Sequence, residues 1–232
     1  MINLDDIGAA IAELERSRAK GLCGALITVV PPASRPFRSA EYDRFWAAAQ
    51  DLAMPLSLHV GTERADVTQG AGAFKLDVKN VPPAFFVNKD HHIRQSLADL
   101  IFSGVFERYP GLHVGTVEHE LSWIPFFLDQ LDYCYTQRPP RGPEWIRYRD
   151  RDTLPSHFFH RNVFASFQED NVALKVREEI GVQTMLWGSD YPHTESTFPR
   201  SREILGRILA GIPADDVRRI VSTNCAELYG FD

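Results

Sequence analysis

Polar side chains that could bind a metal ion or move a proton follow apolar segments of this 232-residue chain, near His59, Glu118, Ser166 and Asp190. Asp190 is the strongest candidate for a functional residue among these. The apolar segment that begins at Met185 continues into Gly188-Ser189-Asp190 and then into a turn fixed by a proline. Such an aspartate can be a metal ligand or a general base held rigidly. Aspartate also caps ordinary turns, so both interpretations stay open.

His59 ends a second apolar segment, Leu56 to His59, and Gly61 follows it. Its imidazole can bind a metal through one nitrogen while a carboxylate orients the other nitrogen. A hydrogen-bonded structural histidine suits the same position, and for a single histidine that is the commoner case.

The segment Glu118-His119-Glu120 offers two carboxylates and an imidazole in three residues. Strand alternation places Glu118 and His119 on opposite faces. Both can point into one site only if the strand ends between them, and otherwise either is a solvated loop residue.

The remaining histidines and motifs give weaker evidence of a functional site. His91 and His92 diverge on a helix, which argues against a joint ligand pair, and His157 and His160 are interpreted as surface or loop residues. The sequence contains no GxGxxG, P-loop or GxSxG motif, which argues against nucleotide binding and against a serine hydrolase of the α/β type.

The elements that must position these residues alternate along the chain. Apolar strands are predicted at 22–30, 55–60, 112–117, 162–166 and 183–187, and amphipathic helices at 5–20, 39–52, 92–109, 122–135, 201–210 and 213–229. This alternation predicts an α/β fold with a parallel sheet, whose strand ends are where sites are built. Segment 137–155 is predicted to be a loop; its arginines could bind a substrate carboxylate, and a solvated basic loop is the alternative.

The composition of the chain excludes several classes of protein. The chain has 25 basic and 31 acidic residues, a net charge of −6, and 44% of its residues are hydrophobic. Residues 1–232 therefore suffice for one domain with a sizeable core. The absence of a basic stripe argues against nucleic acid, and no apolar segment is long enough to span a membrane. The acidic N-terminus and three distant cysteines predict a reduced, cytoplasmic protein.

Several segments together resemble the amidohydrolase-related family of metal-dependent (β/α)8 barrels, which includes aminocarboxymuconate-semialdehyde decarboxylase. The similarity occurs in family order over nearly the whole chain. It is carried by Tyr42 to Gln50, Pro55 to Thr62, Val117 to Pro125 with Leu131-Asp132, Gly188 to Ser196, and Asn224 to Gly230.

The resemblance implies a divalent metal ion, with Zn²⁺ expected, and a ligand set of His59, Glu118 and Asp190. Asp190 would also handle the proton of the attacking water, since a bound Zn²⁺ lowers the pKa of its water to about 7. The same resemblance places His193 and Trp123 at the rim of the site or just behind the metal ligands. We expect His193 to join Asp190 in catalysis, and Trp123 and His119 to contact the substrate.

The sequence departs from the family in one respect. Members begin with a His-x-His pair on the first strand, and no His-x-His occurs here. Five strands are predicted rather than eight, so we expect a TIM-barrel-type domain without its first three strands. Strands 25–30 and 185–187 would then be unpaired edges that favour a homo-oligomer or a further N-terminal segment. Metal affinity is expected to be weak.

The leading functional prediction is a metal-dependent hydrolase that acts on a small carboxylated or aromatic compound. A non-oxidative decarboxylase of the same family is the alternative, because both reactions use the same metal site. A non-catalytic remnant, or a fragment of an active enzyme, is the third possibility.

Overall fold

The computed structural model describes residues 1–63, 83–138 and 148–231. Residues 139–147, which include part of the predicted arginine-rich loop, lie outside the described residues.

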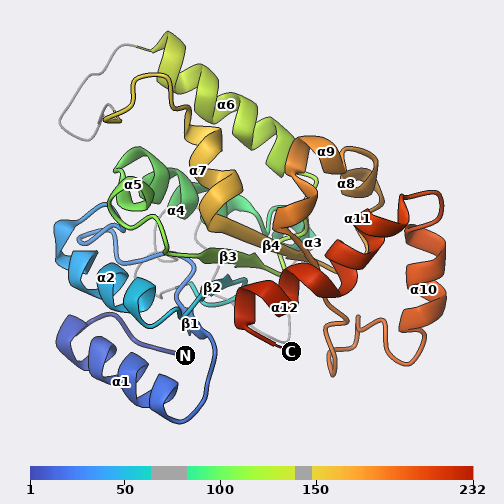
Figure 1. Cartoon of the computed structure of the whole chain (residues 1–232), viewed down its shortest axis with the longest axis horizontal. Coiled ribbons are helices and arrows are strands. Elements are labelled where there is room, and N and C mark those ends of the chain that lie inside the picture. Colours follow the sequence, from blue (N-terminus) through green and yellow to red (C-terminus); the bar gives the residue numbers. More distant parts are fainter. Residues whose placement is uncertain (64–82, 139–147, 232) are drawn as a thin grey trace.

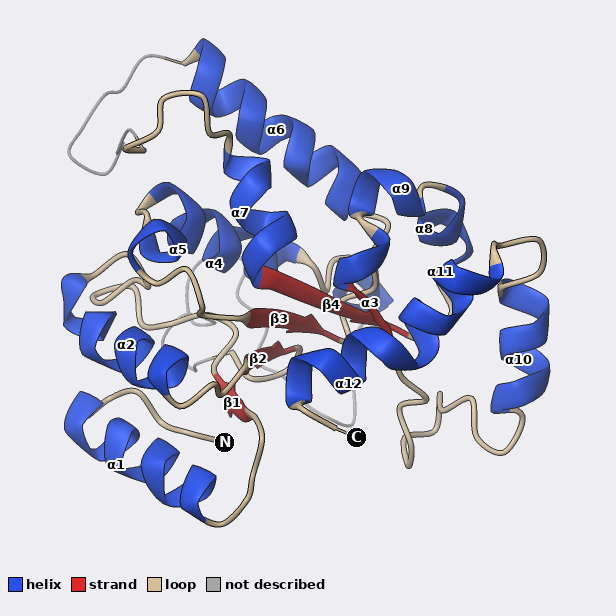
Figure 2. Ribbon diagram, viewed as in Figure 1, coloured by secondary structure: helices blue, strands red, loops and turns tan. Residues whose placement is uncertain are grey.

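A parallel sheet of five strands forms the centre of the described chain (Figure 2). Its order is β1-β2-β3-β4-β5, so each strand pairs with the next one in the sequence, as strands do in the wall of a (β/α) barrel. The predicted α/β class and partial barrel are confirmed. The strands are β1 Ala25–Ile27, β2 Leu56–His59, β3 Val114–Val117, β4 Val163–Phe167 and β5 Met185–Trp187.

Helices cover the sheet, with α1 and α2 at its β1 end and α8 to α11 toward its β5 end (Figure 1). The α-helices are α1 Ile7–Ala19, α2 Asp43–Asp51, α3 Pro83–Val87, α4 His91–Phe102, α5 Val105–Arg108, α6 Ile124–Gln137, α7 Pro155–Asn162, α8 Asn171–Lys175, α9 Arg177–Ile180, α10 Ser201–Ile208, α11 Ala214–Arg218 and α12 Asn224–Tyr229. The 3₁₀ segments are η1 Ala40–Tyr42 and η2 Val182–Thr184, and η3 Arg219–Thr223 is a π-helix.

The apolar face of the second predicted helix is buried as its spacing requires. Tyr42, Phe45, Trp46 and Ala49 are at most 1% exposed, and the Phe45 and Trp46 rings meet edge to face at 5.6 Å. Burial of each of the large side chains stabilises the fold by about 1.5–3 kcal/mol. This helix therefore contributes its apolar face to the core and packs beside α1.

Two helical predictions need correction. The helix predicted at 92–109 is two helices, because Gly104 adopts a left-handed conformation (φ 72°) between α4 and α5. His157 and His160, interpreted as surface or loop residues, lie in α7, where His157 is exposed at the surface as predicted and His160 is half-buried. Pro155 occupies the first turn of that helix. Backbone N–H groups have no partner within the helix there, so the missing N–H of proline breaks no hydrogen bond.

The predicted edges of the sheet are confirmed, and each has a partial cover. The amide of Ile2 donates to the Leu26 carbonyl at 2.8 Å on the outer side of β1. Beyond β5, the side-chain amide of Asn224 donates to the carbonyls of Val182 and Met185 at 2.7 and 2.9 Å. Both ends of the described chain therefore stabilise the sheet.

Close packing fills the inner face of the sheet near its amino end. Gly115 and Phe164 are register partners on neighbouring strands. A Cβ at Gly115 would lie 2.0 Å from the Phe164 ring, so only glycine leaves room for that ring. The Tyr229 ring of α12 meets Phe164 edge to face at 6.2 Å. Phe164 therefore packs between β3 and α12.

Candidate metal centre

Three residues in the left-handed backbone region follow strands β3 and β5. Glu118, Glu120 and Asp190 have φ values of 62°, 55° and 58°, although non-glycine residues rarely adopt this conformation. All three line the same cavity. Backbone strain of this kind concentrates at functional sites, and here it turns each side chain away from the path of a regular strand.

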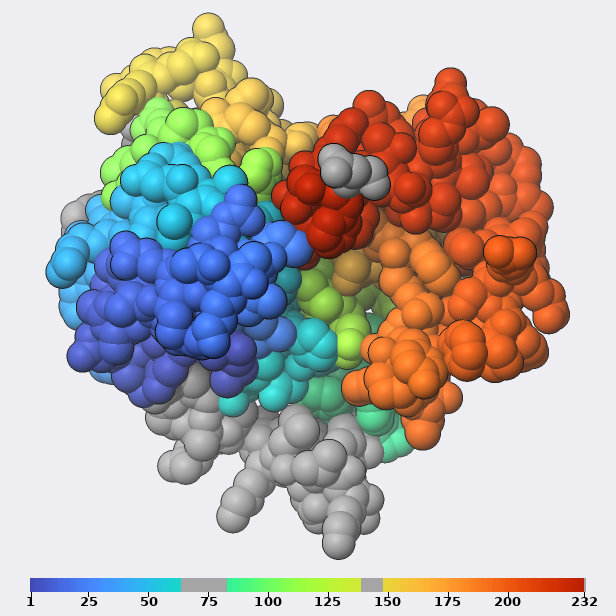
Figure 3. Space-filling model, turned by 60° about the horizontal axis from the view of Figure 1, so that its bottom comes forward, coloured from blue at the N-terminus to red at the C-terminus, as the bar shows by residue number. Residues whose placement is uncertain are grey.

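The cavity lies at the carboxyl ends of the strands and has a volume of about 550 Å³. Strand-end residues form one wall and α3 with the residues after it forms another. On the space-filling surface, a hollow separates the blue-to-cyan N-terminal part from the orange C-terminal part (Figure 3). The described lining residues are His59, Val60, Phe85, Phe86, Lys89, Val117, Glu118, Glu120, Ser166, Phe167, Gln168, Gly188, Asp190, His193, Thr194 and Glu195.

His59, the last residue of β2, is oriented by its own neighbour. Its Nδ1 donates to the Val60 carbonyl at 2.6 Å, which leaves Nε2 facing the cavity, 2.8 Å from Oε1 of Glu118. A histidine whose Nδ1–H is held by a backbone carbonyl is prepared to bind a metal through Nε2. Burial raises the pKa of Glu118, the charge of His59 opposes this rise, and the nearby Asp190 adds to it.

Asp190 and His193 are brought together by a tight turn. The His193 amide donates to the Asp190 carbonyl at 2.9 Å, and the two side chains approach to 3.8 Å between Oδ2 and Nδ1. The Ser189 carbonyl accepts from the Thr197 amide at 3.0 Å and from Ser196 Oγ at 2.8 Å. This loop is therefore tied down on both sides of Asp190.

One ligand atom from each of Glu118, Asp190 and His193 lies within 4.8 Å of the others. Two carboxylates and an imidazole are oxygen and nitrogen donors of the kind that Zn²⁺ and Mn²⁺ accept, so this group fits a divalent ion. His59, which the family resemblance places in the ligand set, lies outside this group and contacts it through Glu118. His193, predicted as a catalytic residue, lies inside it.

The two residues predicted to contact substrate lie beside the cavity rather than among its described lining residues. His119 is 2% exposed, and its Nδ1 pairs with Thr116 Oγ1 at 3.0 Å. Burial lowers the pKa of His119 to about 3, so its ring is uncharged at neutral pH. Trp123 donates from Nε1 to the Glu120 carbonyl at 2.9 Å. Both side chains buttress the loop that holds Glu118 and Glu120.

Sequence reasoning missed two contacts that shape the site. Lys89, from the turn between α3 and α4, pairs with Glu120 at 3.4 Å. Asp170 accepts backbone hydrogen bonds from Leu121 and Ser122 at 2.9 and 2.8 Å, and so joins the loop after β4 to the loop after β3. The only signal for Asp170 was its place before a short helix, which it caps, while nothing in the sequence pairs Lys89 with Glu120.

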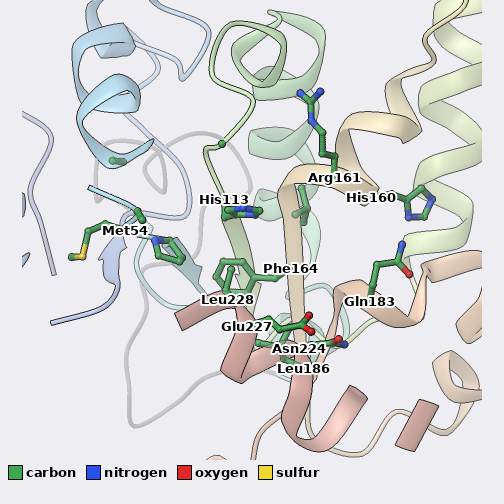
Figure 4. A pocket seen from close by; sticks show the side chains of 15 residues that line it. Met54, His113, His160, Arg161, Phe164, Gln183, Leu186, Asn224, Glu227 and Leu228 are labelled. Carbon is green, nitrogen blue, oxygen red and sulfur yellow. The ribbon is translucent and has the colours of Figure 1, made fainter. Parts of the chain in front are cut away.

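A second cavity, of about 430 Å³, lies at the opposite end of the strands. Side chains from the ends of β4, α7 and α12 surround it (Figure 4). Burial, with a smaller contribution from the charge of Arg161, lowers the pKa of His113 in its wall. The group of Glu118, Asp190 and His193 and this second cavity therefore lie at different ends of the strands. Among the described residues, no helix is both long and apolar enough to cross a membrane.

Comparison with known proteins agrees with the observed fold. A model of the amidohydrolase family matches residues 1–231, and no curated protein matches the sequence. An amidohydrolase from Mycobacterium avium subsp. paratuberculosis is 21% identical with a TM-score of 0.76, over 100% of this chain and 57% of that protein. The chain thus spans little more than half of that protein.

Two decarboxylases are also similar in structure. The 2,6-dihydroxybenzoate decarboxylase from Rhizobium is 22% identical with a TM-score of 0.72, over 99% of this chain and 69% of that protein. A dihydroxybenzoic acid decarboxylase from Polaromonas was solved with manganese and the inhibitor 2-nitroresorcinol. It is 20% identical with a TM-score of 0.71, over 98% of this chain and 67% of that protein. At these identities the similarity shows a shared fold, the TIM barrel, of which this chain forms a part.

Proposed function

Because this chain belongs to the amidohydrolase family, we propose that it is a metal-dependent enzyme that removes CO₂ from a small aromatic acid. The observation that carries the proposal is the group formed by Glu118, Asp190 and His193 in one cavity at the strand ends. The aromatic wall formed by Phe85 and Phe86 and the decarboxylases among the similar structures support the substrate class.

Glu118, Asp190 and His193 would hold the ion, with His59 positioned through Glu118. We propose Zn²⁺, which binds nitrogen and oxygen donors more tightly than Mn²⁺; Mn²⁺, present in the Polaromonas enzyme, is the alternative. A divalent ion supplies a Lewis acid that polarises a substrate oxygen and lowers the pKa of a bound water. With three ligands from the described chain, we expect weak binding.

We assign the proton transfer to Asp190 and His193. Loss of CO₂ from a ring carbon requires a proton at that carbon, and the two side chains lie 3.8 Å apart at the cavity wall. The His193 side chain is 65% exposed, so it can exchange protons with solvent while the half-buried Asp190 faces the substrate. Delivery of a proton by a positioned side chain contributes about 10²–10⁴-fold in rate.

Hydrolysis is the second candidate, and the same exposure favours it. Water reaches the Asp190–His193 pair from solvent, and Asp190 can accept a proton from an attacking water. In either case we propose that copies of the chain associate through the partly covered strand edges.

Turnover tests the proposal. The protein is incubated with 2,6-dihydroxybenzoate and either ZnCl₂ or MnCl₂, and release of 1,3-dihydroxybenzene is followed by chromatography. We expect metal-dependent release that falls at least about 100-fold in Asp190→Asn, with Asp150→Asn as the matched surface control. Release of the same product without metal, or at an unchanged rate in Asp190→Asn, would contradict the proposal. Hydrolysis of esters or amides without decarboxylation would favour the second candidate.

A further inference from the structure

The cavity contains one basic side chain of the lysine or arginine type among its described lining residues. Lys89 shares the cavity with four acidic residues, Glu118, Glu120, Asp190 and Glu195, and pairs with Glu120. If a divalent ion neutralises Glu118 and Asp190, Lys89 and Glu120 neutralise each other. Glu195 lies beside Gln168, whose side-chain amide donates to the backbone carbonyl of Glu195. Among the described lining residues, Lys89 is therefore the one lysine or arginine side chain that an anionic substrate group can bind.

The ion pair between Lys89 and Glu120 is poised for exchange. Its N–O distance is 3.4 Å, and the two side chains are 26% and 30% exposed. Glu120 has a second contact, since its Oε2 accepts from the Gln168 amide at 3.4 Å. Both contacts are long for charge-assisted hydrogen bonds. A ligand carboxylate that approached Lys89 more closely would therefore gain a stronger bond than the one it replaced, and Glu120 would keep the Gln168 amide.

An apolar wall adjoins Lys89. Phe85 and Phe86 of α3 pack edge to face, with ring centroids 5.6 Å apart, and Phe86 is 51% exposed although it is a large aromatic side chain. Both rings line the cavity. An aromatic ligand could cover this exposed surface, and edge-to-face or offset contacts between rings add to the gain from burial.

We propose that Lys89 is the specificity-determining residue for an anionic group on the substrate, which displaces Glu120, while Phe85 and Phe86 pack against the ring that carries it. This inference rests on the proposed function for the substrate class, but it concerns binding alone. It selects aromatic acids over uncharged aromatic compounds of the same shape.

Binding of benzoate, with benzamide as its uncharged match, tests the inference by NMR titration of the metal-loaded and the EDTA-treated protein. We expect Lys89→Met to raise the benzoate dissociation constant about tenfold. Glu120→Gln is expected to lower it several-fold, because Lys89 then lacks a competing carboxylate. Benzamide binding should change in neither variant. Lys175→Met, which removes an exposed lysine of α8, is the matched control and should behave as wild type.

The opposite signs of the two effects separate this inference from a structural disturbance, which would weaken binding in both variants. Equal benzoate affinity of Lys89→Met and wild type would overturn it, as would weaker binding in Glu120→Gln or no benzoate binding by the wild type. Benzoate binding to the EDTA-treated protein is measured without a metal ion and without turnover. A protein that binds benzoate through Lys89 but releases no CO₂ would contradict the proposed function and leave this inference intact.

Discussion

Replacement of Asp170 by alanine tests how the loop that carries Glu118 and Glu120 is held in place. Asp170 is 8% exposed, and its carboxylate accepts from the amides of Leu121, Ser122 and Ala173 at 2.9, 2.8 and 3.0 Å, and from the Ser122 hydroxyl. Burial raises the pKa of this carboxyl, but these hydrogen bonds outweigh burial and lower it. One side chain therefore caps α8 and fixes the loop after β3.

The expected cost follows from these contacts. Loss of a helix N-cap costs about 1 kcal/mol, and each buried amide left without a partner costs about 1–3 kcal/mol. The Leu121 amide is buried, whereas the part-exposed Ser122 amide can turn to water. We therefore expect Asp170→Ala to lower the free energy of unfolding by about 3 kcal/mol, and the midpoint of thermal unfolding by roughly 6–12 °C for a chain of this size.

Urea and thermal unfolding measure this cost. Asp150→Ala is the matched control, because Asp150 makes similar turn hydrogen bonds to Asp152 and Thr153 at the surface; its loss should cost less than about 1 kcal/mol. Ser122→Ala, which removes only the hydroxyl, should be intermediate. An Asp170→Ala protein as stable as the Asp150→Ala protein would refute the reasoning, since it would mean that water replaces the carboxylate without cost.

Two further perturbations test the packing and the electrostatics away from the candidate metal centre. Gly115→Ala should lower stability by about 1–3 kcal/mol in urea unfolding, because the added methyl meets the Phe164 ring; Phe164→Leu should restore part of the loss, and a neutral Gly115→Ala would be the contrary result. The pKa of His113 is lowered in the folded protein by burial and by Arg161, so its contribution to stability is present above about pH 6.5 and is lost as the pH falls. His113→Gln should therefore gain stability relative to wild type between pH 7 and 5, and a constant difference over that range would argue against this assignment.

The strands were predictable from the sequence because both faces of a parallel sheet are buried. Four predicted strands contain an observed one, and β4 extends one residue beyond the fourth prediction, to Phe167. The polar residues at the strand ends, His59, Glu118 and Asp190, line one cavity as expected. Strand β3 ends at Val117, before both residues, and the positive φ of Glu118 turns it into the cavity while His119 is buried.

What the sequence did not disclose depends on tertiary contact or on unusual backbone. Glycine marks left-handed positions, but nothing marks an aspartate or glutamate that adopts one. The family resemblance placed His193 with Asp190 in catalysis, but the backbone turn that brings the two side chains to 3.8 Å could not be predicted. The ion pair between Lys89 and Glu120 joins residues 31 positions apart, and no periodicity relates them. Helix α7 was missed because Pro155 suggests a loop, whereas proline in the first turn of a helix is favourable.

Titration of the protein with Zn²⁺ by calorimetry, after treatment with EDTA, tests the central claim most directly. If Glu118, Asp190 and His193 share an ion, one weakly bound Zn²⁺ per chain is expected, and both Asp190→Asn and His193→Ala should abolish it while Asp150→Asn leaves it unchanged. Zinc that binds equally well to the Asp190→Asn protein, or that does not bind to the wild type, would contradict the assignment of this cavity as a metal centre.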